Sequence, residues 1–209
     1  MKSSILRAGA ALACAVSLVS CGGGNTGTLY LAGTFEGVTV DGLILQNNGG
    51  SDLVIPGVAG GKGNFTFKDL VPNDSIYNVT VKKTNGVENR PPNTESCTLI
   101  DNSGNTGLYG ATRIQVRCII RTHALAGNIA GLGADTVVLI NGLNQVAVQG
   151  TGASTLPFTM ASVSEGNPYG ISVLTQPAGK TCTVTNGIGT MGTTDVGNVA
   201  VACTANAGT

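Results

Sequence analysis

The chain has 209 residues, of which 11 are basic and 11 acidic, and only 11% of its residues are charged. A neutral chain with so few charges offers little attraction to phosphate groups, so the composition excludes nucleic acid as a partner.

Residues 1–20 have the layout of a signal peptide for export. Lys2 and Arg7 supply a positively charged start, and an apolar run broken only by small residues extends from Ala8 to Val19. The run is too short to span a bilayer as a helix, so a transmembrane segment fits it less well than a signal peptide that is removed.

The apolar run ends in Leu18-Val19-Ser20-Cys21, followed by three glycines. This motif resembles the lipobox of bacterial lipoproteins. The resemblance implies cleavage after Ser20 and a diacylglyceryl group on Cys21, which makes the lipid bilayer a partner of the mature chain. An ordinary secretory signal with an incidental cysteine is the alternative. In Gram-negative lipoproteins an aspartate after the cysteine tends to retain the protein on the inner membrane, so Gly22 favours the outer membrane, with the chain facing the periplasm or the cell surface.

Residues 21–30 are expected to form the lipidated cysteine and a flexible tether. The piece from Gly22 to Thr28 is polar and rich in glycine, and its extended reach is at most about 25 Å. Each buried lipid methylene contributes about 0.8 kcal/mol, so several acyl chains on one cysteine would hold a folded domain at a membrane.

The rest of the chain is an internal repeat. Residues 97–118 and 182–203 each begin and end with a cysteine, and their gapless overlay also matches glycines in the middle. Upstream, residues 31–47 align without a gap on residues 125–141. The first copy carries a short insertion around Val87 to Arg90. This repeat predicts two domains, residues 31–121 and residues 124–207.

Cysteine use predicts one disulfide in each domain. The signal peptide takes one cysteine and the lipid another, which leaves four thiols in an exported chain. Equal spacing within the repeats favours Cys97 with Cys118 and Cys182 with Cys203 among the three possible connectivities. A zinc site is the alternative, but such cysteines without a CxxC motif or a neighbouring histidine have poor zinc spacing. No metal and no cofactor is therefore predicted.

Apolar and polar residues alternate along several segments, which is the pattern of half-buried strands. One face of residues 76–81 carries Tyr77, Val79 and Val81, and the alternation recurs at residues 168–173 and before the last cysteine of each copy. About seven short strands per copy, with glycine and asparagine turns, predict an all-β fold. We expect two tandem antiparallel β-sandwiches of the immunoglobulin-like or transthyretin-like type.

One pair of segments carries a family resemblance. Residues 63–70, GNFTFKDL, and residues 77–81, YNVTV, resemble a strand pair of carboxypeptidase-regulatory-like, transthyretin-like sandwiches. The match covers a short part of the first copy and implies a fold without implying an activity. The whole repeat also resembles Gly/Asn/Thr-rich modules of uncharacterised Gram-negative lipoproteins, from which no function transfers.

The sequence shows no catalytic constellation. His123 is the only histidine, and we expect it to be exposed in the connection between the domains. Neither a G-x-S-x-G nucleophile motif nor a phosphate-binding P-loop is present. We therefore predict a protein that is not an enzyme and has no catalytic residues, with a metal-dependent enzyme as the least favoured hypothesis.

These features predict a non-enzymatic, outer-membrane-anchored lipoprotein that acts as a binding or spacer module at the bacterial cell envelope. Its partner would be an unknown envelope protein or a glycan. The alternative is a dedicated glycan- or peptidoglycan-binding lipoprotein, because the second domain is rich in asparagine and threonine and poor in charge.

Binding is expected on loops, since core packing explains the strand positions. The insertion at Val87 to Arg90 and the loops Asn102 to Gly110 and Asn186 to Gly197 are longer than hairpins need. The candidate binding residues on them are Arg90, Asn102, Tyr109 and Asn186. The alternative is that these loops are tolerated surface variation, because long surface loops cost little stability.

Overall fold

A computed structural model describes residues 27–108 and 110–207 of the chain. The expected signal peptide, the expected lipidation site Cys21 and the candidate binding residue Tyr109 lie outside the described residues. Within the described part, no helix has both the length and the apolar character needed to cross a membrane.

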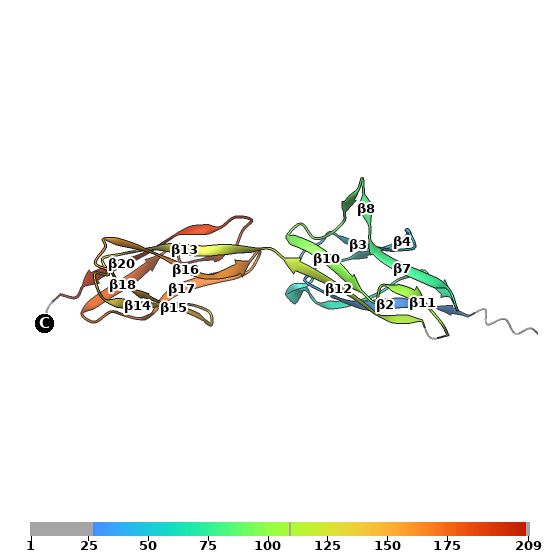
Figure 1. The fold of residues 1–209 in the computed structure, drawn as a ribbon, viewed down its shortest axis with the longest axis horizontal. Helices are drawn as coiled ribbons and strands as arrows, with labels where there is room; N and C mark the ends of the chain where they lie inside the picture. The colour runs from blue at the N-terminus through green and yellow to red at the C-terminus, as the bar shows by residue number, and fades with distance from the viewer. Residues whose placement is uncertain (1–26, 109, 208–209) are drawn as a thin grey trace, which may run out of the picture.

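The first half of the chain folds into two packed four-stranded sheets (Figure 1), ordered β10-β12-β2-β5 and β11-β7-β3-β4. Two short pairs, β1–β6 and β8–β9, and the 3-10 helix η1 (Ala59–Gly61) complete it. The strands are β1 (Thr28–Leu29), β2 (Leu31–Glu36), β3 (Leu43–Asn47), β4 (Gly50–Ile55), β5 (Gly63–Thr66), β6 (Val71–Pro72), β7 (Ile76–Val81), β8 (Lys83–Thr84), β9 (Val87–Glu88), β10 (Thr94–Ile100), β11 (Ser103–Asn105) and β12 (Ala111–Ile120).

The second half repeats this arrangement, with sheets ordered β18-β20-β13-β16 and β19-β17-β14-β15. Its strands are β13 (Thr122–Ala130), β14 (Thr136–Asn141), β15 (Asn144–Gln149), β16 (Thr155–Ser164), β17 (Pro168–Thr175), β18 (Lys180–Thr185), β19 (Ile188–Thr190) and β20 (Val196–Ala205). Each strand occupies the place of its aligned counterpart in the first half. The predicted all-β fold of two tandem sandwiches is confirmed.

One strand pair in each sandwich departs from the antiparallel expectation. The first strand of each repeat lies parallel to the last, β2 beside β12 and β13 beside β20, whereas the other pairs between described strands are antiparallel. Apolar and polar residues alternate in the same way in parallel and in antiparallel strands, so the sequence pattern does not reveal the parallel pairing.

Each sandwich has its own apolar core. Residues Tyr77, Val79 and Val81 of β7 point inward and are buried, as the alternation predicts. The second core forms separately around Leu139, Phe158 and neighbouring residues. Because no buried cluster is shared, each sandwich gains its stability chiefly from its own packing.

The parallel pairs explain why one glycine is repeated. A Cβ atom built on Gly33 would lie 2.0 Å from the carbonyl oxygen of Ile114, and one on Gly127 would lie 2.0 Å from that of Val199. Both contacts are to backbone atoms of the neighbouring parallel strand, which cannot rotate away. Only glycine allows the backbones to approach this closely.

Each sandwich contains one disulfide. Cys97 and Cys118 face each other across the β10–β12 pair, and Cys182 and Cys203 face each other across the β18–β20 pair. The bonds therefore join neighbouring strands of one sheet from its inner face. No bond connects the two repeats.

The two long glycine-rich segments are not simple loops. After β10 the chain crosses to the other sheet, forms β11 at its edge beside β7, and returns to form β12. The segment after β18 does the same, with β19 beside β17. Their length, which a hairpin does not need, is accounted for by this crossing.

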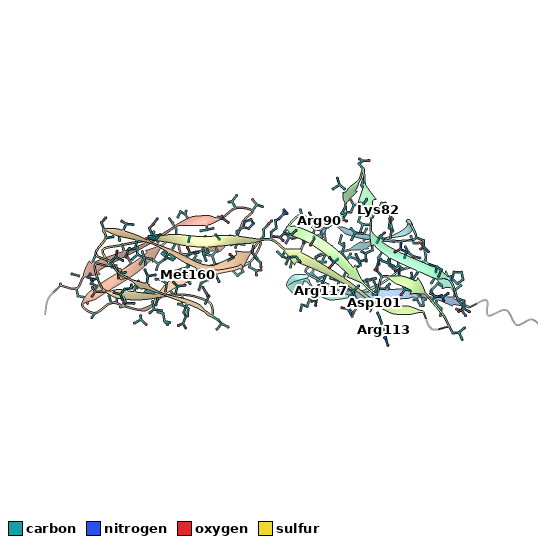
Figure 2. All side chains as sticks on the ribbon, viewed as in Figure 1. Lys82, Arg90, Asp101, Arg113, Arg117 and Met160 are labelled. Atoms are coloured by element: carbon teal, nitrogen blue, oxygen red, sulfur yellow. A yellow bond between two sulfur atoms is a disulfide. The ribbon has the colours of Figure 1, made fainter. Side chains whose placement is uncertain are left out.

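The insertion in the first repeat forms a small hairpin. Strands β8 and β9 pair around a tip at Asn85 and Gly86, whose φ angles of 51° and 81° suit a tight hairpin turn. The hairpin projects from the first sandwich (Figure 1), and Lys82 and Arg90 lie at its base (Figure 2).

Candidate functional site

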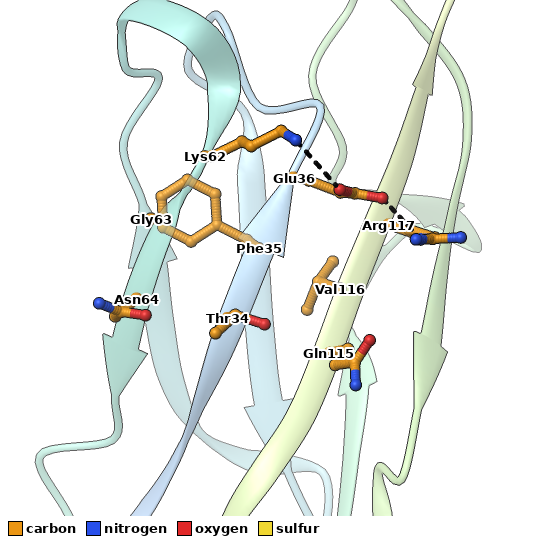
Figure 3. Close-up of a pocket in the computed structure, with 9 residues that line it drawn as sticks. All are labelled: Thr34, Phe35, Glu36, Lys62, Gly63, Asn64, Gln115, Val116 and Arg117. Carbon is orange, nitrogen blue, oxygen red and sulfur yellow. Dashed lines mark ion pairs between the residues drawn. The ribbon is translucent and has the colours of Figure 1, made fainter.

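A polar groove runs along the outer face of the first sandwich where β5, β2 and β12 lie side by side (Figure 3). It has a volume of about 390 Å³. Its lining residues are Thr34, Phe35, Glu36, Lys62, Gly63, Asn64, Gln115, Val116 and Arg117. We call it the β2–β12 groove.

Charge in the β2–β12 groove is organised around Glu36. Its Oε1 lies 2.6 Å from Nε of Arg117, and its Oε2 lies 3.7 Å from Nζ of Lys62. Asn64 and Gln115 add amide groups nearby (Figure 3). Two cations and one carboxylate leave one positive charge in excess, and the amides both donate and accept hydrogen bonds. The groove is thus suited to hold a polar ligand by hydrogen bonds.

The second repeat does not keep the charges of this groove. In the alignment of the repeats Glu36 corresponds to Ala130 and Arg117 to Ala202, and the pairing of β16 with β13 places Thr155 where the first copy has Lys62. The same fold therefore forms without these charged side chains. Their presence in the first sandwich is a local feature of its surface and is not required by the scaffold.

A second polar cluster joins the two sandwiches. Only Arg121 separates β12 from β13, and its backbone bonds to both halves: its N–H donates to the carbonyl of Asn93 at 2.9 Å, and its carbonyl accepts from the N–H of Glu165 at 2.9 Å. The Glu165 Oε2 lies 3.6 Å from Nε of Arg121. We call this group, with His123 and Asp195, the junction cluster.

The expectation of an exposed histidine is wrong. The His123 side chain is only 15% exposed, with its Nε2 3.7 Å from Oε2 of Glu165 and its Nδ1 3.7 Å from Oδ1 of Asp195. Asp195 Oδ1 also accepts a hydrogen bond from the N–H of Ala124 at 2.8 Å. The histidine lies between two carboxylates that are far away in the sequence.

A cavity of about 230 Å³ lies between the sandwiches beside the junction cluster. The first sandwich lines it with Asn93 and residues near η1, and the second with residues 165–167. Asn93 donates from Nδ2 to Oγ1 of Thr39 at 2.9 Å. The contact between the halves is therefore small and mostly polar, and is centred on Arg121.

The candidate loop residues serve structural roles where they are described. Arg90 donates from Nη1 to the carbonyl of Thr94 and so closes the base of the β8–β9 hairpin. Asn186 has a positive φ of 57° and donates to the carbonyl of Asn198 at 3.3 Å. These contacts are all within the residue's own sandwich. They give each residue a structural role that does not depend on ligand binding.

Asn102 shows this most clearly. Its Nδ2 donates to the carbonyl of Val79 at 2.7 Å, and its own carbonyl accepts from the N–H of Val79 at 2.7 Å. We expect Asn102→Ala to lower the free energy of unfolding of the first sandwich by about 1 kcal/mol, because a partly buried carbonyl loses its partner. Hydrogen exchange of the β7 amides measures this loss. Asn64→Ala, at an exposed position, is the control and should change stability by less than about 0.5 kcal/mol. Equal effects of the two changes would contradict a structural role for Asn102.

The described residues contain no group of three or more His, Cys, Asp or Glu side chains placed to hold a metal ion. Glu36 in the β2–β12 groove faces two cations, and the groove residues include no serine, cysteine or histidine to act with it. The arrangement supports binding by hydrogen bonds and charge.

The candidate residues predicted from the sequence do not include Glu36, Lys62, Arg117 or Glu165. Glu36 and Arg117 are neighbours only because β2 lies parallel to β12, a pairing without a local pattern. A signal for Glu165 did exist, since the chain after Arg121 has just three acidic residues. All three are paired: Glu165 and Asp195 in the junction cluster, and Asp135 with Lys180 at 2.9 Å.

No protein-family model matches the chain, and no curated protein matches it. Solved structures show a weak likeness. The major pilin protein T3.2 of Streptococcus pyogenes aligns at 11% identity over 88% of this chain and 99% of that chain, with a TM-score of 0.33. Two B repeat units of the collagen binding protein CNA of Staphylococcus aureus align at 16% identity over 88% of this chain and 51% of that chain, with a TM-score of 0.26.

The minor pilin GBS52 of Streptococcus agalactiae aligns at 9% identity over 86% of this chain and 98% of that chain, with a TM-score of 0.27. Identities and TM-scores this low carry no argument about activity or partners.

Proposed function

We propose that this chain is a non-enzymatic spacer of the bacterial cell envelope, held on the outer membrane through an acylated Cys21. In this proposal the tether is residues 21–27, shorter than the predicted 21–30, because Thr28 and Leu29 pair with β6 as part of the first sandwich. The predicted domains, residues 31–121 and 124–207, act as one stiff unit. The observation that supports it most strongly is the junction, where one residue links two sandwiches placed end to end (Figure 1).

The contacts at Arg121 oppose bending. Its backbone is hydrogen-bonded to both halves, and its side chain forms an ion pair with Glu165, whose side chain is only 15% exposed. A linker of several polar residues would behave as a flexible coil, whereas one residue fixed on both sides leaves few free torsions. Such a joint keeps whatever the far end carries at a set distance from the anchor.

The test is to insert Gly-Ser-Gly-Ser between Arg121 and Thr122 in the Cys21→Ser chain. The native arrangement should scatter X-rays as one elongated particle, and the insertion should broaden the distribution of the maximum dimension. The same insertion between Asn85 and Gly86, at the tip of the β8–β9 hairpin, is the matched control and should leave the dimension unchanged. Scattering of the native chain that already requires many bent arrangements would disprove the stiff spacer.

A second candidate function is glycan binding in the β2–β12 groove. The supporting observation is that the groove carries amides and charges which the second repeat replaces at the aligned positions, Gln115 by Ala200 and Arg117 by Ala202. Retention on isolated peptidoglycan that is lost in the Asn64→Ala, Gln115→Ala chain would favour this function. Equal retention of the native and the variant chain, or no retention of either, would contradict glycan binding in the groove and leave the spacer as the one proposed function.

A further inference from the structure

The end of the first sandwich from which the tether leaves carries four large exposed apolar side chains. Tyr30 is 59% exposed, Leu70 44%, Ile76 67% and Leu108 49%. We call this end the N-terminal pole. Exposed apolar residues that occur singly need no explanation, but a group at one end of a molecule marks a contact surface.

The backbone holds these four residues together. Leu29 pairs with Val71, which places Tyr30 near Leu70. Ile76 pairs with Asn105, and the carbonyl of Gly107 accepts from the N–H of Asp74 at 3.0 Å, which places Leu108 near Ile76. The N–H of Asn73 donates to the carbonyl of Gly27 at 3.0 Å, so the start of the described chain belongs to the same end.

The second repeat shows that the fold does not require these side chains. At the equivalent positions it has Ala124 for Tyr30, Ser162 for Leu70, Pro168 for Ile76 and Thr193 for Leu108. In the first copy, which lies next to the expected anchor, all four positions are large and apolar. Large apolar side chains are thus found at these positions only in the copy that lies next to the expected anchor.

We infer that the N-terminal pole rests on the lipid bilayer, with Tyr30, Leu70, Ile76 and Leu108 in the interface. This inference rests on the proposed anchoring through Cys21. The occupant follows from the length of the chain outside the structure: six residues after Cys21 reach Gly27, and that piece spans no more than about 22 Å when fully extended. A surface held this close to lipid headgroups meets them continually.

The chemistry of the pole fits this occupant. Tyr30 has an apolar ring with a polar hydroxyl, which suits the boundary between headgroups and acyl chains. The charged residues next to Leu70 and Ile76 in the sequence are Lys68, Asp69 and Asp74, which give no excess of positive charge, so attraction to anionic lipid is not the main force. The main force is the burial of apolar surface. The contact would orient the spacer relative to the membrane, in addition to the tethering by the lipid.

The chain has no tryptophan, which permits a clean test. Ile76→Trp is expressed as the full lipoprotein and placed in phosphatidylcholine vesicles whose acyl chains are brominated near the glycerol end. Interfacial side chains bury about 5–10 Å into this region, so bromine should remove most of the tryptophan fluorescence. Ile188→Trp is the matched control, since Ile188 is 86% exposed but lies on the second sandwich. Its fluorescence should not change.

Failure of the anchor is distinguished from failure of the pole. Mass spectrometry of the N-terminal peptide first shows whether Cys21 is acylated. If Cys21 is not acylated, the proposed function fails. The pole is then tested separately by coupling the Cys21 thiol to a maleimide lipid in the same vesicles. Vesicle-bound Ile76→Trp chain that keeps its full fluorescence in brominated lipid overturns the inference. So does an emission shift that needs no vesicles and grows with protein concentration, because a second copy then covers the pole.

Discussion

Replacing Gly127 with alanine is expected to destabilise the second sandwich by about 3 kcal/mol or more, because overpacking against a backbone cannot relax by moving a side chain. The added Cβ would lie 2.0 Å from the carbonyl oxygen of Val199 and 2.8 Å from the Phe158 ring. To make room, β13 must separate from β20 along the parallel pair. Hydrogen exchange of the second-sandwich amides, measured apart from those of the first, gives the loss.

Gly170→Ala is the matched control for that change. Gly170 also lies in a strand of the second sandwich, but nothing lies within 4 Å of the Cβ that alanine would add. Its effect should stay below about 1 kcal/mol, because alanine mainly restricts the unfolded chain there. A Gly127→Ala protein as stable as Gly170→Ala would show that the parallel pair is looser than the structure indicates.

Removal of one disulfide has the second large effect. The Cys182→Ala, Cys203→Ala chain should lose about 3 kcal/mol in the free energy of unfolding of the second sandwich, since the bond closes a long loop in the unfolded chain. The two cysteines are 21 positions apart and face each other on neighbouring strands. Urea unfolding followed by hydrogen exchange at the β18 and β20 amides measures the change.

The first sandwich provides the internal control, because its core and its Cys97–Cys118 bond are separate. Its exchange rates should stay as they are in the native chain, as expected for independent sites. Loss of protection in both halves at once would mean that the sandwiches unfold as one cooperative unit.

The features predicted correctly are those that leave a regular pattern in the sequence. Alternation along residues 76–81 defines a strand and its buried face, and the equal cysteine spacing defines a repeat with its own disulfide. The strands β11 and β19 were not predicted because each has three residues, too few to show alternation, and each forms by pairing with a neighbour.

The candidate sites were harder to predict because their residues meet only in the folded chain. The side chain of His123 is partly buried and lies beside Glu165, 42 positions later, and beside Asp195, and no local pattern links the three. The loop residues chosen instead were conspicuous for their glycine-rich surroundings. Those surroundings reflect the turns needed to cross between sheets, as the contacts of Asn102 show.

The parallel first and last strands give the first sandwich a mechanical property. A load applied between an anchored N-terminus and the rest of the chain enters at the start of β2 and leaves at the end of β12, two strands that lie side by side and point the same way. The pull then runs along the strands, in shear, so the hydrogen bonds between them must break together. If the strands were instead pulled apart from one end, the hydrogen bonds between them would break one at a time. The same geometry recurs at β13 and β20, so each sandwich resists stretching along the line that joins the start of the described chain to its end.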